Sequence, residues 1–435
     1  MNKENGIPRI EWSPKVIVVD GNNGNTIKTL TDDDDDDSFS SSYKIPSKFY
    51  MLPSNVVLIP FHSINGENPG HLVWDDFLPI YNLLHLFELN GNSKNNNNNM
   101  EPLMLRYVLD SGKVRGLWAS CDWNKEKRKT CNIMHNKFLP LMTTRHGNQS
   151  KLTTTVLSEF NITTSTTTVS KRSTVKEEAE QQQQQPPQQQ KQANNNNNNN
   201  NTSAGNLICA RHGVAGLGSL TDHGTVKLHG WEDNDYKITH NHGRSWLFWE
   251  FRQFAMKNLG ILKDDKDYRN DIQSDILRQR PLKIIFSLSS SSRSNRNIKF
   301  TQEIAKLKQT FATDGIHDVI IESYKFKDYT LKEQVQIAND ASIFVSGCGG
   351  GAVTSIFVPK GASIILYYAS NGGVRQNKMT GLPARLDWDL FNNLGYARVH
   401  WLDRVTMSRN EDLNNFVELI KHELNVIRYE YPPTT

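Results

Sequence analysis

A glycine-rich turn, Ser346-Gly347-Cys348-Gly349-Gly350-Gly351, follows a strand-like apolar segment that ends at Val345. Glycine lets the backbone approach a ligand closely, and a helix after such a turn points its first N–H groups and positive dipole end at that ligand. An anionic diphosphate suits this geometry, so the pattern favours ligand binding. The alternative is that these glycines only allow a tight connection between a strand and a helix.

Two arginines, Arg293 and Arg296, lie in the serine-rich stretch Ser289 to Asn297, directly after another strand-like segment. Guanidinium groups bind phosphate oxygens through paired hydrogen bonds, and serine side chains can add further ones. Basic residues in such a loop are more often simply solvated. Together with the glycine turn, however, this stretch gives two phosphate-suited loops at one predicted sheet edge.

Other chemical fingerprints fit less well. The segment from Ser346 to Gly350 lacks the first glycine of a nucleophile elbow, so Cys348 is not an obvious catalytic thiol. No G-x-G-x-x-G pattern follows the first strand of this region and no Walker A sequence is present, which argues against dinucleotide enzymes and P-loop enzymes. His240-x-His242 has no carboxylate or cysteine at ligand spacing, so we expect no metal site.

The elements that must position these loops alternate between strand and helix from Pro281 onward. Short links between them are typical of a doubly wound α/β domain with a parallel sheet, in which ligands bind at the carboxyl ends of the strands. We expect strands at 283–288, 319–321, 342–345, 363–367 and near 399, and helices at 301–311, 331–338, 351–357 and 411–427.

The region before it predicts a second α/β unit, because strand-like and helical apolar patterns alternate there as well. We expect a strand at Val56 to Ile59 ended by Pro60, a helix from about His71 to Leu89, a strand near Leu105 to Leu109, and a helix from Ser245 to Leu259 ended by Gly260. Structure should resume at Leu207 after a Thr-, Gln- and Asn-rich stretch.

Length and composition give the domain boundaries. A chain of 435 residues predicts two domains, and runs of Asp, Asn and Gln cannot bury enough apolar surface to fold. We therefore expect a disordered segment at 1–48, an N-terminal α/β domain at 49–265 with a disordered insertion at 143–205, and a C-terminal α/β domain at 266–435.

Charge and cysteine content exclude several classes of protein. The net charge is only +4, from 50 basic and 46 acidic residues without a basic stripe, so a nucleic-acid partner is not expected. No segment approaches the roughly 20 apolar residues that span a bilayer. Cys121 and Cys131 could close a loop, although free buried thiols are the favoured interpretation.

The segment from Glu333 to Leu366 resembles the C-terminal signature of glycosyltransferase family 61. Residues in register with that signature are Gly349, Gly351, Phe357, Pro359 and Gly361. The stretch from Ser287 to Ile298 resembles the arginine-bearing loop of the family, Asn68-Pro69-Gly70-His71 with Asp75 resembles its N-terminal motif, and Arg244 to Phe254 fits its middle helix.

The resemblance implies a GT-B-like architecture of two facing Rossmann-type domains. In such an architecture the domain at 49–265 is on the acceptor side and the domain at 266–435 binds the nucleotide sugar. The resemblance also implies inverting transfer from a UDP-linked nucleotide sugar to a glycan or glycoprotein acceptor, without a bound metal or other cofactor. The donor-binding residues it implies are Arg293, Arg296, Cys348, Gly349, Gly350, Gly351, Ala352 and Thr354. Cys348 stands where the family has histidine and Gly350 where it has alanine, and a thiol cannot supply the ring N–H of imidazole to a phosphate.

Inverting transfer needs a base on the acceptor hydroxyl and stabilisation of the leaving diphosphate. Asp75 and His71 are the candidate catalytic residues, because their i, i+4 spacing places them on one helical face. The base would be a carboxylate or a histidine of the N-terminal domain. The alternative for Asp75 and Asp76 is that both are solvated or capping residues.

Two further hypotheses compete with the transferase. One is a degenerate relative that binds a nucleotide or glycan without turnover, and the other is an unrelated nicotinamide-dependent oxidoreductase on a doubly wound sheet. The family resemblance implies the lumen of the Golgi or endoplasmic reticulum. The start of the chain is polar and lacks a signal-like apolar stretch, so a cytoplasmic location stays open.

Overall fold

The computed structural model describes residues 16–19, 27–30, 49–52, 54–61, 63, 66–90, 100–106, 121, 123–143, 207–214, 243–262, 281–288, 298–368, 385–403 and 410–430. These residues fall into two compact units. The first holds the described residues from 55 to 143 and from 212 onward, and the second holds the others.

The C-terminal part of the first unit is a five-stranded sheet. Its strands are β8 (Leu282–Ser287), β9 (Val319–Tyr324), β10 (Ile343–Gly347), β11 (Ser363–Tyr368) and β12 (Arg398–Asp403). All neighbours pair in parallel in the order β12-β11-β10-β8-β9, so the predicted parallel sheet is confirmed. Strand order reverses between β8 and β10, which makes the gap between their carboxyl ends a topological switch point.

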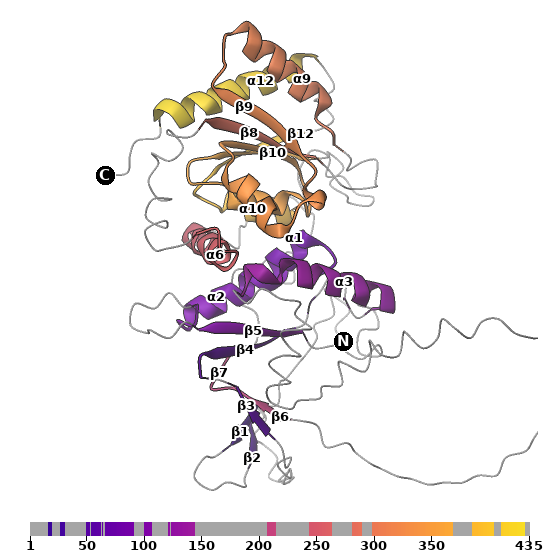
Figure 1. Ribbon diagram of the computed structural model, residues 1–435, viewed down its shortest axis with the longest axis vertical. Coiled ribbons are helices and arrows are strands. Elements are labelled where there is room, and N and C mark those ends of the chain that lie inside the picture. Colours follow the sequence, from indigo (N-terminus) through magenta and orange to yellow (C-terminus); the bar gives the residue numbers. More distant parts are fainter. Residues whose placement is uncertain are drawn as a thin grey trace, which may run out of the picture. The chain divides into compact units, whose positions relative to one another are not determined.

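Helices cover both faces of this sheet (Figure 1). The helices α9 (Thr301–Thr313) and α12 (Asn410–Asn425) pack on the face that carries Ile284 and Phe286. The opposite face carries Ile285 and packs against α10 (Leu331–Asn339) and a 3-10 helix, η9 (Ala352–Phe357). This division follows from the alternation of side chains along a strand.

Most C-terminal elements match their predicted positions within a few residues. The helix α10 begins with a capping box, in which Thr330 and Glu333 satisfy each other's backbone N–H groups. One helix, α11 (Arg385–Asn392), was not predicted. Its eight residues span only about two turns, which is too short for a clear helical period.

The N-terminal part of the first unit has a three-stranded parallel sheet in the order β5-β4-β7. These strands are β5 (Glu101–Arg106), β4 (Val56–Phe61) and β7 (His212–Gly213). The prediction that Pro60 ends the first strand was wrong. Among the described residues, β7 pairs only with Val57 and Leu58, and no strand pairs with Pro60 on that side of β4, so no N–H donor is needed there.

One helical segment follows β4, in three parts: α1 (Pro69–His71), a π-helical turn η2 (Leu72–Phe77) and α2 (Leu78–Leu86). It begins at Pro69, two residues before the predicted start, because the Asn68 side chain accepts a hydrogen bond from the N–H of Gly70 and caps it. The π-helical turn was not predicted. Such turns are found mostly at functional sites.

The helix α3 (Lys125–Phe138) was also missed, because its sequence is mainly polar and only Cys131, His135 and Phe138 are buried. Cys121 and Cys131 form a disulfide, so the preference for free thiols was wrong. The sequence separation of 10 residues did not show that α3 would bring the two sulfurs together. Cys348 is a free cysteine.

The helix α6 (Ser245–Asn258) ends at Gly260, whose φ of +62° confirms the predicted stop. Together with α2 and β4 it shares one hydrophobic core with α10, η9 and β10. The mixed α/β fold with parallel sheets is therefore as predicted. The GT-B arrangement of two facing domains and a boundary near residue 265 remain predictions.

The second unit contains short strands. β1 (Val16–Val19) pairs antiparallel with β2 (Ile27–Leu30), inside the segment predicted to lack structure. β3 (Phe49–Met51) pairs in parallel with β6 (Leu207–Cys209), where the sequence predicted structure to resume. Most of the predicted insertion at 143–205 lies outside the described residues. In the part of the chain that is described, no helix has the length and apolar character needed to cross a membrane.

Candidate functional site

The glycine turn begins where β10 ends, at the topological switch point. Gly349 has a φ of +115°, a conformation that residues with a side chain rarely adopt. The N–H of Cys348 donates to the carbonyl of Tyr367 at 2.8 Å, and the N–H of Ala352 donates to the carbonyl of Gly349 at 2.8 Å. The turn is thus held to β11 on one side and closes into η9 on the other.

The N-terminal motif packs directly on this turn. A Cβ atom at Gly70 would lie 3.1 Å from the Cα of Gly350. A Cβ atom at Gly350 would collide with the Oδ1 of Asn68 and lie 3.2 Å from the Cδ of Pro69. The contact therefore depends on glycine in both segments. The motif at 68–71 therefore contacts the turn at 347–351, although the two segments are about 280 residues apart in the sequence.

His71 and Asp75 are paired one helical turn apart, with His71 Nδ1 at 2.7 Å from Asp75 Oδ2. The carboxylate can only accept, so the ring N–H donates to it and the Nε2 carries the basic lone pair. The Asp75 side chain is 6 % exposed, whereas that of His71 is 24 % exposed. Asp75 is therefore not a solvated residue, and of the pair it is His71 that reaches the surface.

The next residue, Asp76, is held by a second buried set of polar groups. Ser63 Oγ donates to Asp76 Oδ2 at 2.5 Å, and His135 Nε2 lies 4.0 Å from the same oxygen. All three side chains are buried. Cys121 donates its N–H to the carbonyl of Ser63, so the disulfide to Cys131 joins this set to α3. Asp76 is a structural group that fixes the π-helical turn presenting Asp75.

The predicted donor residues differ in their surroundings. Gly351 is exposed and Cys348 is half-buried, whereas Ala352 and Thr354 are buried below the turn. Burial, followed by the charge of Asp387, raises the pKa of the Cys348 thiol well above its ordinary value. The sulfur is therefore a neutral thiol at physiological pH, which agrees with the expectation that it is not a nucleophile.

Arg293 and Arg296 lie outside the described residues. The strand β8 leads into their segment at the switch point, and the described chain resumes at Ile298, whose Cδ1 would lie 2.9 Å from a Cβ atom at Gly347. Phe300 follows with a φ of +53°, a strained conformation for an aromatic residue. Strained residues of this kind cluster at functional sites.

Arg252 was not singled out from the sequence, although it lies within the predicted middle helix. It is fully buried, donates from Nε to the carbonyl of Phe357 at 3.2 Å, and donates from Nη2 to Asn339 Oδ1 at 2.5 Å. Its guanidinium also lies 4.7 Å from the centre of the Trp249 ring. Arg252 thereby joins α6 to the end of η9, the helix that follows the glycine turn. An arginine between Phe251 and Phe254 on an apolar helical face was the available signal.

Within the described residues, no three or more His, Cys, Asp or Glu side chains are grouped as metal ligands. His240 and His242 lie outside those residues.

The sequence was also compared with known protein families. Residues 164–365 match the family model described as Glycosyltransferase 61. The matched range contains α6, β8, β10 and the glycine turn, together with the segment of Arg293 and Arg296, and it starts after the motif at 68–75. No curated protein matches the chain. The match supports a glycosyltransferase family 61 domain within residues 164–365.

Proposed function

We propose that the chain transfers a sugar from a nucleotide-sugar donor, UDP-linked, to a hydroxyl of a glycan or glycoprotein acceptor, with inversion and without a bound metal. One observation carries this proposal. The contact between Gly70 and Gly350 brings the His71–Asp75 pair to the glycine turn at the switch point. A base and an anion-binding loop at one place are what an inverting transferase requires.

His71 is the base in this mechanism and Asp75 is the group that orients it. Asp75 holds the ring proton on Nδ1, so the Nε2 takes the proton from the acceptor hydroxyl. The acceptor oxygen then forms a bond to the anomeric carbon while the bond from that carbon to the diphosphate breaks. The nucleoside diphosphate leaves with the electron pair. The greater exposure of His71 supports this division of roles.

The leaving diphosphate lies at the glycine turn in this proposal. Its negative charge is stabilised by Arg293 and Arg296 and by the backbone between Gly349 and Gly351, where no side chain obstructs close approach. The remaining predicted residues, Cys348, Ala352 and Thr354, shape the turn beneath the ligand. Two facing GT-B domains would close over the donor and keep water away from the anomeric carbon.

An oxidising compartment fits the proposal. Cys121 and Cys131 form a disulfide, and disulfides persist in the oxidising secretory lumen but are rare in the cytosol. This supports the Golgi or endoplasmic reticulum lumen as the place of action, in agreement with the family to which the domain belongs.

The test is release of UDP from a panel of UDP-sugars in the presence of glycan acceptors. We expect turnover by the wild type and a loss of about 100- to 10,000-fold in kcat for His71→Ala, the range typical of a general base. Asp75→Asn should also lower kcat, because an amide favours the wrong ring tautomer. The control is His317→Ala, which changes an exposed histidine in the connection between α9 and β9. Equal turnover by His71→Ala and the wild type would remove His71 from the mechanism.

A binder without turnover is the second candidate function. Cys348 favours it, because the family has histidine at this position and a neutral thiol gives a phosphate no ring N–H. Binding of UDP without consumption of any UDP-sugar, together with turnover gained by Cys348→His, would establish this alternative.

A further inference from the structure

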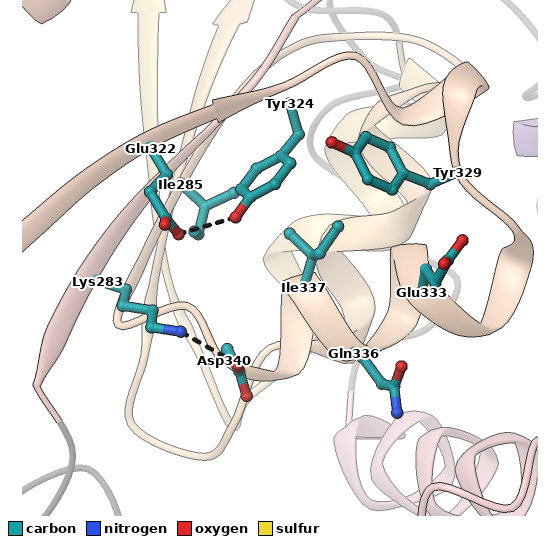
Figure 2. A pocket seen from close by; sticks show the side chains of 9 residues that line it. All are labelled: Lys283, Ile285, Glu322, Tyr324, Tyr329, Glu333, Gln336, Ile337 and Asp340. Carbon is teal, nitrogen blue, oxygen red and sulfur yellow. Dashed lines mark hydrogen bonds and ion pairs between the residues drawn. The ribbon is translucent and has the colours of Figure 1, made fainter.

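A groove of about 280 Å³ runs between the edge strand β9 and the helix α10, on a different part of the sheet from the glycine turn. Figure 2 shows the side chains that line it. They come from β8, β9, the loop after β9 and α10: Lys283, Ile285, Glu322, Tyr324, Tyr329, Glu333, Gln336, Ile337 and Asp340. None of them belongs to the site proposed above.

The groove has an apolar strip made largely of aromatic rings. Tyr324 and Tyr329 meet edge to face with their ring centres 5.6 Å apart, and both are half-buried. Ile337 from α10 points toward them (Figure 2). Aromatic faces at a solvent-accessible groove offer a stacking surface for the C–H groups of a ligand. The strip is too small to seat an apolar peptide, because Ile285 and Ile337 are its only aliphatic members.

Polar groups border this strip on both sides. The hydroxyl of Tyr324 donates to Glu322 Oε2 at 2.9 Å, and Lys283 Nζ donates to Asp340 Oδ2 at 3.3 Å. Burial, followed by the hydrogen bond to Glu322, raises the pKa of Tyr324 to about 12, so its hydroxyl stays protonated at physiological pH. Glu333 and Gln336 add acceptor and donor groups along α10.

The charges of the groove narrow the class of ligand. Three carboxylates and one ammonium give the lining a negative balance, which disfavours phosphate and sulfate groups. Each carboxylate already accepts a hydrogen bond within the protein: Glu322 from Tyr324, Asp340 from Lys283 and Glu333 from Thr330. Because each carboxylate is already partly neutralised by its donor, a cationic ligand would have to compete with that donor, whereas a hydroxyl can donate to a remaining lone pair. An uncharged ligand with one apolar face and a rim of hydroxyls fits this pattern.

We propose that this groove is a second binding site, which takes a neutral sugar unit of a glycan through stacking on Tyr329 and hydrogen bonds to Glu322, Glu333 and Gln336. That the sugar belongs to the acceptor of the transfer reaction rests on the proposed function, whereas the binding itself does not. The groove would hold a glycan branch away from the reacting centre and so favour extended acceptors over single sugars.

The test is equilibrium binding of the full chain to an array of neutral oligosaccharides, with spermine and sulfated oligosaccharides as charged probes. Stacking on one ring is worth about 0.5 to 1.5 kcal/mol, so Tyr329→Ala should weaken binding of a neutral oligosaccharide about 2- to 12-fold. Tyr329→Phe, which keeps the ring, should retain it. The matched control is Tyr429→Ala, because Tyr429 is 76 % exposed and lies outside the groove.

Each outcome either supports or overturns the proposed sugar site. Binding of a neutral oligosaccharide that is weakened about 2- to 12-fold in Tyr329→Ala and kept in Tyr329→Phe and Tyr429→Ala would establish the groove. Binding of spermine alone or of sulfated oligosaccharides alone would overturn the proposal, as would binding that Tyr329→Ala leaves unchanged. A melting temperature close to that of the wild type shows that Tyr329→Ala is folded. Because no donor is needed, a chain that fails to bind UDP still tests this groove.

Discussion

The two parallel sheets of the first unit differ in how strongly their own sequence specifies them. In the C-terminal sheet, strands and helices alternate along the chain, and the inner strands β10 and β11 are nearly continuous apolar runs between helices on both faces. In the N-terminal sheet, β7 joins β4 from about 155 residues further along the chain, and α3 is mainly polar. The C-terminal sheet is therefore specified by local sequence pattern, whereas the N-terminal sheet depends on pairing between segments that are distant in the sequence.

The two regions also differ in their proposed roles. In the proposed mechanism, the C-terminal sheet supplies the glycine turn that binds the diphosphate, and the N-terminal helix supplies the His71–Asp75 pair on a π-helical turn. The two meet at a contact between two glycines, Gly70 and Gly350. The predictions below test each region and then the contact between them.

The largest effect is expected for Arg252→Ala, which breaks the link from the N-terminal helix α6 to η9. The change leaves the carbonyl of Phe357 and the side chain of Asn339 without this donor and opens a cavity. We expect a loss of about 3 to 4 kcal/mol in the free energy of unfolding. Chemical denaturation measures it, with Lys257→Ala on the exposed side of α6 as the control. A loss below about 1 kcal/mol would show that the link is not important.

A slightly smaller effect is expected at Glu423, on the helix α12 that packs against the C-terminal sheet. Burial acts to raise the pKa of this carboxyl, but hydrogen bonds from His400, Ser363 and Arg398 outweigh it and lower the pKa to about 2. Because the folded pKa lies below the unfolded value, the stabilisation is complete above about pH 5 and is lost as the pH falls toward 2. It amounts to about 3 kcal/mol at neutral pH.

This pH dependence is checked by chemical denaturation of the wild type and of Glu423→Gln, with the free energy of unfolding measured from pH 7 to pH 2. The difference between them should shrink as the pH falls through this window. Glu418→Gln on the same helix, at a side chain that is 70 % exposed, should follow the wild type throughout. A constant difference at every pH would contradict the assignment.

The corresponding change in the N-terminal region is Cys121→Ser with Cys131→Ser. Removing a disulfide that closes a loop of about ten residues costs about 2 to 3 kcal/mol. The effect should be local, because the bridge joins α3 to the segment beside Ser63. We expect faster hydrogen exchange in α3 and unchanged exchange in β8, β10 and β11. Equal acceleration in both sheets would mean that the two regions unfold as one.

The smallest expected effect on stability tests the contact itself. Gly350→Ala should cost about 1 to 3 kcal/mol, because the new Cβ collides with Asn68. Gly351→Ala is the matched control, since a Cβ there meets nothing within 4 Å. Combining Asn68→Gly with Gly350→Ala should recover part of the loss, because glycine is a tolerable cap and removes the colliding side chain. If the losses in the free energy of unfolding of the two single variants simply added in the double variant, the contact between Asn68 and Gly350 would be contradicted.

Sequence pattern alone predicted the C-terminal sheet, its parallel order and the glycine turn at its carboxyl edge. Those features depend on neighbouring residues: apolar runs such as Ile343 to Val345, the Thr330 cap and the glycines themselves. The family resemblance then identified the domain, which the match over residues 164–365 confirmed.

What the sequence did not predict depends on distant contacts. Pro60 stays within β4 because of where β7 stops, and α3 is buried along only one narrow stripe. The burial of Arg252 depends on partners 87 and 105 residues further along the chain. The disulfide joins residues only ten positions apart, but it depends on the helix α3, which was missed. The π-helical turn at Asp75 was not predicted either. The pairing of His71 with Asp75 was predicted from spacing alone, while the burial of Asp75 was not.

The central claim, that the glycine turn binds the diphosphate of a UDP-sugar, is tested most directly by thermal stabilisation of the purified chain. The ligands are UDP, GDP, CMP and NAD at millimolar concentration, because a ligand that binds only the folded state raises the melting temperature by mass action. The account predicts a rise with UDP that disappears in Arg296→Ala and persists in Arg211→Ala, which changes an exposed arginine elsewhere. A rise with NAD alone, or none with any nucleotide, would contradict it.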